Sequence, residues 1–193
     1  DESGACVIFD PSCISKEEQD ELSEYIYQNE LKPLAVVITH GHFDHVPGVG
    51  FIVEEFGCPF LGHLKDLPLV EFAPQQASVF GVKMDTPPKG YDRALVHKEK
   101  LVLGEMSFAV LHVPGHSEGS LAFYSQDGGF VIVGDVLFKG SIGRTDLPGG
   151  DYNTLINSIQ THLLVLPEST IVLPGHGHES SIGSEKASNP FLR

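Results

Sequence analysis

Apolar runs separated by charged or turn-forming residues predict alternating strands and helices in the first part of the chain. Residues 5–9 form a short apolar run after a turn-like opening. Residues 34–38, Leu-Ala-Val-Val-Ile, form a continuous run that is typical of a strand covered on both faces. Between them, Ser15 and Glu18 have the spacing of a capping box, which predicts a helix that ends near Asn29. We therefore expect an α/β arrangement.

The next segment predicts a second helix over residues 46–56. Pro47 would lie in its first turn and Gly57 just after its end, where these residues are tolerated. Asp44 and His45 would then lie at the start of this helix. Three further elements are expected before the middle of the chain: a strand at residues 58–61, a short helix at 64–72 and a loop at 84–92.

The pattern then changes to a series of short strands, at residues 94–97, 100–103, 106–112, 121–125 and 130–134. Residues 126–129, Gln-Asp-Gly-Gly, join the last two strands as a hairpin turn. Asp151 can cap a helix that runs to about Leu166, and residues 170–173 predict a final strand. We expect the polar tail that follows, to Arg193, to pack against the body of the protein.

The composition is that of a globular protein. A length of 193 residues and a hydrophobic content of 41% fit one domain over residues 1–193. Because the chain opens on a turn, we expect that a first strand is missing from this domain. No apolar run approaches the roughly 20 residues of a membrane span, and no targeting pattern opens the chain, so we expect a cytoplasmic protein with no membrane partner. Cys6, Cys13 and Cys58 form no C-x-x-C pair and are interpreted as buried thiols.

The charge of the chain narrows the class of partner. A formal net charge of −14 argues against nucleic acid, because Lys and Arg side chains that neutralise phosphates dominate that affinity. Two divalent ions would bring about four positive charges into one cleft, so an acidic protein can still attract an anionic substrate. We therefore expect a small-molecule partner.

Candidate metal ligands gather in segment 39–45, Thr-His-Gly-His-Phe-Asp-His, directly after the predicted strand 34–38. Neutral imidazole and carboxylate groups are the usual ligands of Zn²⁺ and its neighbours. His116, Asp135 and His176 follow other predicted strands. Ligands collect at the carboxyl ends of strands in open α/β sheets, and these four strand-to-loop junctions each present His or Asp.

The order of these motifs, His-x-His-x-Asp-His, Gly-His, Gly-Asp and Gly-His, resembles that of the metallo-β-lactamase-fold hydrolases over nearly the whole chain. The resemblance implies an α/β fold, an αββα sandwich of two mixed β-sheets with helices on the outer faces. It also implies two metal ions. His40, His42 and His116 would bind the first ion, Asp44, His45 and His176 would bind the second, and Asp135 would bridge both.

Within that superfamily the sequence is most similar to hydroxyacylglutathione hydrolases, the glyoxalase II enzymes, and in particular to their short bacterial relatives. The likeness rests on segment 143–151, Gly-Arg-Thr-Asp-Leu-Pro-Gly-Gly-Asp. Arg144 stands where the longer enzymes place a lysine near the substrate, and its guanidinium suits a carboxylate; a surface ion pair is the alternative. The chain stops soon after His176, without the C-terminal helical domain that supplies glutathione contacts, so its preference for a glutathione thioester is left open.

The resemblance implies hydrolysis of an anionic thioester such as S-D-lactoylglutathione by a hydroxide that bridges two metal ions. Even one zinc ion lowers the pKa of a bound water to about 7, and a thiolate leaves readily, so no strong general acid is required. Asp44 and Asp135 are the candidate catalytic residues, and Asp44 can also orient the hydroxide. Zinc is the favoured metal, with iron and manganese as alternatives. Asp135 stands where the true β-lactamases of this superfamily usually have cysteine, which argues against antibiotic hydrolysis.

Other activities stay open at the level of sequence. A persulfide dioxygenase, which resembles this family, would hold one iron through two histidines and an aspartate. A lactone hydrolase would use the same hydroxide, a noncatalytic metal-binding module would show no turnover, and RNA processing is disfavoured by the charge.

Several residues near the motifs are expected to have structural roles. The histidines that match no ligand motif are His63, His97, His112, His162 and His178. Asp146 is expected in a turn or at a helix cap. Tyr91 and Tyr152 are expected to pack in the core or on the surface.

Overall fold

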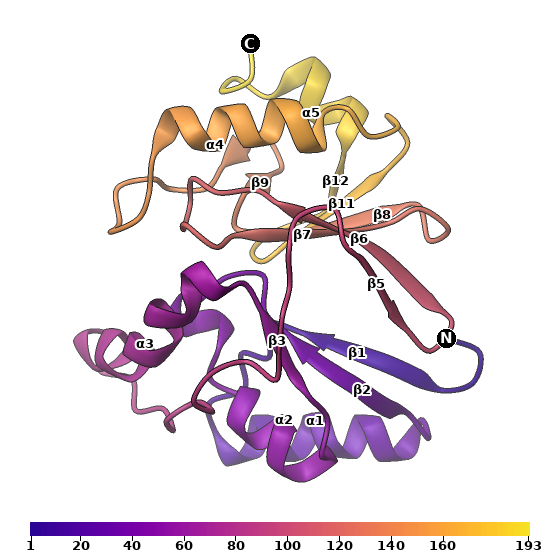
Figure 1. The fold of residues 1–193 in the computed structure, drawn as a ribbon, viewed down its shortest axis with the longest axis vertical. Coiled ribbons are helices and arrows are strands. Elements are labelled where there is room, and N and C mark those ends of the chain that lie inside the picture. The colour runs from indigo at the N-terminus through magenta and orange to yellow at the C-terminus, as the bar shows by residue number, and fades with distance from the viewer. The chain divides into compact units, whose positions relative to one another are not determined.

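The computed structural model describes residues 1–193, and the chain forms two compact units (Figure 1). The first unit contains residues 1–94 and 102–106, and the second contains residues 95–101 and 107–193. The single domain expected over residues 1–193 stays a prediction. None of the helices is both long and apolar enough to cross a bilayer.

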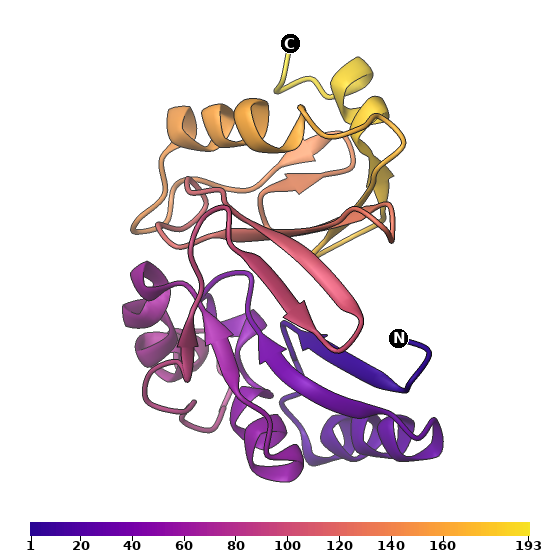
Figure 2. The ribbon, with the colours of Figure 1, turned by 45° about the vertical axis from the view of Figure 1, so that its right-hand side comes forward.

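The first unit is built on a four-stranded sheet in the order β1-β2-β3-β4. Its strands are β1 (Ala5–Phe9), β2 (Lys32–Val37), β3 (Phe60–Gly62) and β4 (Arg93–Ala94), and every neighbouring pair is parallel. Helices α1 (Lys16–Gln28) and α2 (Val49–Phe56) lie together on one face of this sheet in Figures 1 and 2. Parallel strands end at the same edge of a sheet, so the loops after β1 and β2 lie side by side.

Helix α1 begins as the sequence predicts. Ser15 accepts a hydrogen bond from the backbone N–H of Glu18, and the Glu18 carboxylate accepts one from the backbone N–H of Ser15, at 2.8 Å. This capping box satisfies N–H groups that a helix start leaves without an intrahelical partner. The predicted strand at residues 5–9 is also confirmed.

Helix α2 begins three residues later than predicted, at Val49. Asp44 and His45 lie instead in a separate 3₁₀ turn, η1 (Phe43–His45), in which the His45 N–H donates to the His42 carbonyl at 3.0 Å. The N–H of Gly48 donates to the Pro11 carbonyl at 2.8 Å, so the loop after β1 anchors the chain between η1 and α2. The helix ends at Gly57 as expected, in a left-handed conformation with φ +64°.

The predicted short helix at residues 64–72 is longer in the structure. A 3₁₀ turn, η2 (Leu64–Asp66), leads into α3 (Leu67–Val79), which continues through Pro74. Ala73 and Ala77 are fully buried on either side of this proline, so packing holds the helix together past a residue that lacks an N–H donor. Residues 84–92 form a loop, as predicted.

The core of the first unit lies between its helices and the sheet. The buried apolar residues come from β2, β3, α2 and α3 and from the turns beside them: Val36, Ile38, Val46, Val49, Ile52, Cys58, Phe60, Val70 and Ala73. Cys13 and Cys58 are buried and Cys6 is half-buried, and burial raises the pKa of all three thiols. The interpretation as buried thiols is confirmed for Cys13 and Cys58, whereas Cys6 is only partly buried.

The second unit is built on a mixed sheet in the order β12-β11-β8-β7-β6-β5. In chain order its strands are β5 (Lys100–Leu103), β6 (Met106–His112), β7 (Leu121–Ser125), β8 (Phe130–Gly134), β11 (Ile171–Pro174) and β12 (Ser180–Ser181). Strand β7 is antiparallel to β6 and to β8, and β11 is parallel to β8. Strands β6, β8 and β11 therefore run in one direction and end at one edge.

Three helical segments and a small hairpin complete this unit. Helix α4 (Tyr152–Ser158) is capped by Asp151, as predicted, and continues as a π-helical turn, η3 (Ile159–Leu163). Strands β9 (Leu137–Phe138) and β10 (Ser141–Ile142) form the hairpin, and α5 (Ile182–Ser188) follows β12. The core contains Val131, Val133, Leu155, Ile159 and Ile182, among others.

Strands β5, β6, β7 and β8 have the predicted bounds, and the Gly129 N–H closes the predicted turn on the Gln126 carbonyl at 3.2 Å. The prediction of a strand at residues 94–97 is wrong beyond residue 94, where β4 ends. The N–H of Val96 instead donates a hydrogen bond to the Glu99 carboxylate in a turn. Strand β12 and helix α5 were not predicted in the polar tail. Ile182 is buried and Leu192 packs against the core, so the tail does pack on this unit.

Candidate metal centre

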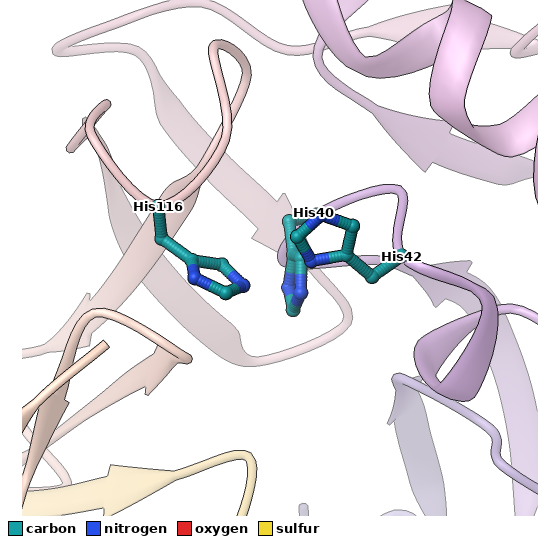
Figure 3. Close-up of side chains that lie close together, drawn as sticks. All are labelled: His40, His42 and His116. Atoms are coloured by element: carbon teal, nitrogen blue, oxygen red, sulfur yellow. The ribbon is translucent and has the colours of Figure 1, made fainter. Parts of the chain in front are cut away.

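The first group of predicted ligands lies at the carboxyl edge of the parallel sheet of the first unit. Segment 39–45 follows β2, and Asp10 directly follows β1. The rings of His40 and His42 meet edge to face, with centroids 4.8 Å apart (Figure 3), and the rings of His40 and His45 are 4.0 Å apart. All three imidazoles are buried. Three of the predicted ligands are thus close together within one unit.

Asp10 is a further candidate for this site that the sequence analysis did not identify. One carboxylate oxygen accepts from the backbone N–H of Thr39 at 2.6 Å, and the other accepts from the Thr39 hydroxyl at 2.7 Å. The second oxygen also lies 3.0 Å from Nδ1 of His45. Asp10, His40 and His45 each offer one ligand atom within 4.8 Å of the others. The available signal was its place directly after a predicted strand, where ligands collect.

The Asp10 carboxylate accepts a hydrogen bond from the His45 ring, which fixes the orientation of that ring. A carboxylate is only an acceptor when ionised, so Nδ1 of His45 carries the hydrogen in this contact. The lone pair of the neutral ring is then on Nε2, which lies 3.7 Å from Oδ2 of Asp44. Histidines that bind metal usually donate their other ring N–H in this way. The backbone of Asp10 is in the left-handed region, at φ +45°, where Asp and Asn are tolerated better than most residues.

Gly41, between the candidate ligands His40 and His42, has no room for a side chain. Its N–H donates to the carboxylate of Asp66 at 2.9 Å, and Asp66 itself is buried. A Cβ at Gly41 would lie 2.7 Å from the Asp66 carbonyl oxygen and 2.8 Å from Cβ of Leu69. The start of α3 therefore holds the loop between His40 and His42.

The second group of predicted ligands lies at the carboxyl edge of the sheet of the second unit. Gly134 at the end of β8 pairs with Pro174 at the end of β11, and the N–H of Gly175 donates to the Gly134 carbonyl at 2.9 Å. Asp135 and His176 follow these two strand ends. Nε2 of His176 lies 3.7 Å from Oδ2 of Asp135. Parallel pairing is thus the reason that two residues 41 positions apart are neighbours.

His116 completes this group from the loop after β6. Its Nε2 lies 3.9 Å from Oδ2 of Asp135, and its Nδ1 lies 2.8 Å from the backbone carbonyl of Arg144. A carbonyl can only accept, so Nδ1 carries the hydrogen and the lone pair of the neutral ring is on Nε2. Figure 3 shows the ring extending from this loop. His116 is buried, and a Cβ at Gly143 would collide with the Asp135 carbonyl, so this glycine allows the chain to pass close to both ligands.

Within each unit, the spacing of neighbouring donor atoms is that of two ligands on one divalent ion. The three nitrogen–oxygen separations of 3.7, 3.7 and 3.9 Å exceed the usual hydrogen-bond distance. Two ligand atoms that are each roughly 2.0–2.2 Å from one ion lie about 3–4 Å apart. Both units therefore present imidazole nitrogen and carboxylate oxygen in an arrangement that can bind a metal.

Arg144 forms the surface ion pair that was the alternative to substrate contact. Its Nε and one terminal nitrogen each donate to a carboxylate oxygen of Asp146 at 2.7 Å. Hydrogen bonds from Arg144 lower the pKa of Asp146 to about 2, and the same contact raises the pKa of Arg144. Both side chains are exposed. Substrate contact by Arg144 stays a prediction.

The remaining histidines have the following positions. Nδ1 of His97 accepts from the backbone N–H of His112 at 3.0 Å, and the rings of His97 and His162 meet edge to face at 4.7 Å. His112 contacts the Glu118 carbonyl through Nε2, at 2.8 Å. His63 accepts from the N–H of Lys65, whereas His178 is exposed. Structural roles are consistent with the contacts of His63, His97, His112 and His162.

The two tyrosines differ in environment. Tyr91 packs on Phe60 with ring centroids 4.8 Å apart, and burial raises the pKa of its hydroxyl. Tyr152, at the start of α4, is exposed. Core packing for Tyr91 and a surface position for Tyr152 agree with the expectation.

Comparison with known proteins supports the family suggested by the motifs. Residues 1–176 match the family described as Metallo-beta-lactamase superfamily. The chain is 39% identical over 187 residues to the probable metallo-hydrolase YqgX of Bacillus subtilis, covering 97% of this chain and 87% of the relative. It is 40% identical over 196 residues to the hydroxyacylglutathione hydrolase GloC of Haemophilus influenzae, covering 100% of this chain and 89% of the relative.

Solved structures give the same result for the fold. The B3 metallo-beta-lactamase BLEG-1 is similar with a TM-score of 0.91 and 39% identity, over 100% of this chain and 90% of that chain. TTHA1623 in a di-iron-bound form is similar with a TM-score of 0.86 and 42% identity, over 95% and 88%. ETHE1 from Myxococcus xanthus has a TM-score of 0.78 and 26% identity, over 97% and 74%. The predicted metallo-β-lactamase fold is confirmed.

Replacing Asp10 by Asn should weaken metal binding about 10- to 100-fold, because a neutral amide oxygen raises the basicity of the His45 ring less than a carboxylate does. Asn is suited to the left-handed backbone at this position, so the fold should be retained. Competition with a chromogenic chelator measures the affinity. Asp127→Asn, in the exposed turn between β7 and β8, is the matched control and should bind as the unchanged protein does. Equal affinity for both variants would contradict the orienting role.

Acid should destabilise the second unit through His97 and His162. Burial is the first cause that lowers the pKa of both, and the nearby charges of Lys98 and His112 lower it further. A histidine whose folded pKa lies below the unfolded value of about 6.5 binds its proton more readily in the unfolded chain, so stability is full above that pH and falls as pH decreases.

Urea unfolding of EDTA-treated protein at pH 7.5 and 5.5 measures this effect. His97→Asn keeps an acceptor for the His112 N–H without titrating, so its loss of stability between the two pH values should be smaller than that of the unchanged protein. An equal loss would exclude His97 as a source of the acid sensitivity.

Proposed function

Since the chain belongs to the metallo-β-lactamase superfamily, we propose that it is a metal-dependent hydrolase that cleaves an anionic thioester, in the manner of a hydroxyacylglutathione hydrolase. The observation that carries this proposal is the 40% identity to GloC over 100% of this chain. The imidazole and carboxylate groups described in each unit support metal binding. A second relative, YqgX, is named a probable metallo-hydrolase, which supports metal-dependent hydrolysis as the reaction class.

We assign seven side chains to two divalent ions, following the order of the family's motifs. His40, His42 and His116 would hold the first ion, Asp44, His45 and His176 the second, and Asp135 both. Zinc is our first choice, because four-coordinate imidazole and carboxylate sites are typical of it. Iron and manganese accept the same donors, and the di-iron form of TTHA1623 makes iron a specific alternative.

The chain's own groups would prepare the reaction in three ways. Asp10 and the Arg144 carbonyl set the tautomers of His45 and His116, so both rings offer Nε2. Asp44, whose carboxylate is partly exposed, can accept a hydrogen bond from the attacking water. Arg144 uses two of its N–H groups on Asp146, which leaves three for a substrate carboxylate. When bound, the metal ions would acidify water and polarise the thioester carbonyl.

A persulfide dioxygenase is the second candidate, supported by the 26% identity to ETHE1. Such an enzyme would need one iron with open positions for oxygen and sulfur. Asp44, His45 and His176 favour the hydrolase, because a one-metal dioxygenase has no need of a second ligand set. The similarity to BLEG-1 makes β-lactams a necessary member of any substrate panel.

The test is turnover by EDTA-treated protein reloaded separately with zinc, iron(II) and manganese. We expect hydrolysis of S-D-lactoylglutathione and of simpler thioesters, with little activity on lactones or β-lactams and no oxygen uptake with glutathione persulfide. Iron-dependent oxygen uptake without thioester hydrolysis would refute the proposal and establish the second candidate.

Variants link the activity to the metal ligands. His42→Ala and Asp135→Asn should each lower metal content, measured by elemental analysis. Each should also reduce kcat/KM at least about 100-fold, because the metal ions would supply both the acidified water and the polarised thioester carbonyl. Asp127→Asn is the control and should keep full metal and activity. Full turnover by either ligand variant would contradict the assignment.

A further inference from the structure

A pocket in the second unit lies directly beside a proposed metal ligand. It has a volume of about 420 Å³ and is lined by six residues: Phe138, Lys139, Ser141, His176, Gly177 and His178. That volume lies in the range of pockets that bind small molecules. His176 is the residue assigned to the second ion, so a molecule in this pocket would lie next to the reacting centre.

Among the lining residues, only Lys139 has a side chain that carries a full positive charge throughout the neutral pH range. It lies at the tip of the hairpin formed by β9 and β10, and it makes no ion pair in the structure. Arg144 and Lys186 of the same unit are both paired with carboxylates. In a chain with a net charge of −14, a lysine that keeps its charge available beside a proposed ligand is suited to an anion.

The hairpin that carries Lys139 is fixed by the C-terminal helix. Glu185 of α5 is buried, and its carboxylate accepts from the N–H of Gly140 at 2.9 Å. Asn189, just after α5, donates to the Ser141 carbonyl at 3.0 Å and to Glu185 at 2.8 Å. Gly140 has φ +68°, a backbone conformation that favours glycine at this tight turn. A flexible surface loop needs no such buried anchor, so the wall of the pocket is preorganised.

We infer that this pocket binds a carboxylate of the substrate, separately from the contact proposed for Arg144, with Lys139 as the group that selects an anionic thioester. The inference rests on the proposed function. The ammonium of Lys139 and the hydroxyl of Ser141 supply donors for the carboxylate, and the ring of Phe138 supplies apolar contact for the chain that links it to the thioester. Lys139 touches the substrate away from the reacting carbonyl, so it determines specificity and does not take part in the chemical step.

Steady-state kinetics on three thioesters tests the role of Lys139. S-lactoylglutathione carries its carboxylates on the thiol half, succinyl-N-acetylcysteamine carries one on the acyl half, and lactoyl-N-acetylcysteamine is neutral. Lys139→Ala should raise KM about tenfold for one or both anionic substrates, the loss expected for a hydrogen bond to a charged group. KM for the neutral substrate and kcat for all three should change little. The anionic substrate that is affected identifies the half that enters the pocket.

Two controls separate charge from structure. Lys139→Arg should restore most of the selectivity, and Lys100→Ala, which removes an exposed cation at the start of β5, should behave as the unchanged protein. Added salt should reduce the preference for anionic substrates in the unchanged protein and have no such effect in Lys139→Ala. An unchanged ratio of anionic to neutral kcat/KM in Lys139→Ala would overturn the inference.

Direct binding distinguishes failure of this inference from failure of the proposed function. The dissociation constant of S-methylglutathione, a carboxylate-bearing thioether that cannot be hydrolysed, is measured by calorimetry. If no thioester is turned over but Lys139→Ala weakens this binding, the anion pocket stands and the proposed reaction is wrong. If thioesters are hydrolysed and neither binding nor KM depends on Lys139, the pocket assignment is wrong and the reaction stands.

Discussion

Parallel strand pairing is the constraint on which the candidate metal centre depends. In the first unit, β1 and β2 end side by side, which brings Asp10 to the loop that carries His45. In the second unit, β8 and β11 end side by side, which brings Asp135 to His176. A shift of the β8–β11 register by one residue would turn each following side chain to the other face of the sheet. Strand pairing and register therefore determine which side chains meet at each edge.

Hydrogen bonds to the second ring nitrogen of the candidate histidines also determine the geometry of the site. A carboxylate acts on His45 and a backbone carbonyl acts on His116, and either acceptor leaves Nε2 with the lone pair. The two acceptors differ in charge, so they differ in how much they raise the basicity of the ring. Asp10 carries a full negative charge to a buried histidine, which favours a tighter bond to a cation there than a neutral carbonyl gives to His116.

Much of the fold, and the position of the candidate ligands in loops after strands, could be predicted because the relevant signals are local. Strand β6 and the capping box of α1 follow from periodicity and spacing within a few residues. What could not be predicted depends on tertiary contacts. Asp10 is a single polar residue after a predicted strand, and only the pairing of β1 with β2 brings it to the loop that carries His45. Helix α5 lies in a polar tail, and the burial of Ile182 and Glu185 that stabilises it comes from packing on distant segments.

The C-terminal segment connects stability to the site. The carboxylate of Glu185 is buried, and burying a carboxylate is costly unless it has hydrogen-bond partners. It accepts hydrogen bonds from Gly140, Ser180 and Asn189. An apolar residue at this position would fill the same space without that requirement, but it would leave the N–H of Gly140 without its acceptor. The polar choice therefore fixes the β9–β10 hairpin. It follows that the conformation of this hairpin beside His176 depends on α5, so unfolding of the last helix would disturb the pocket before it disturbed the ligand-bearing strands.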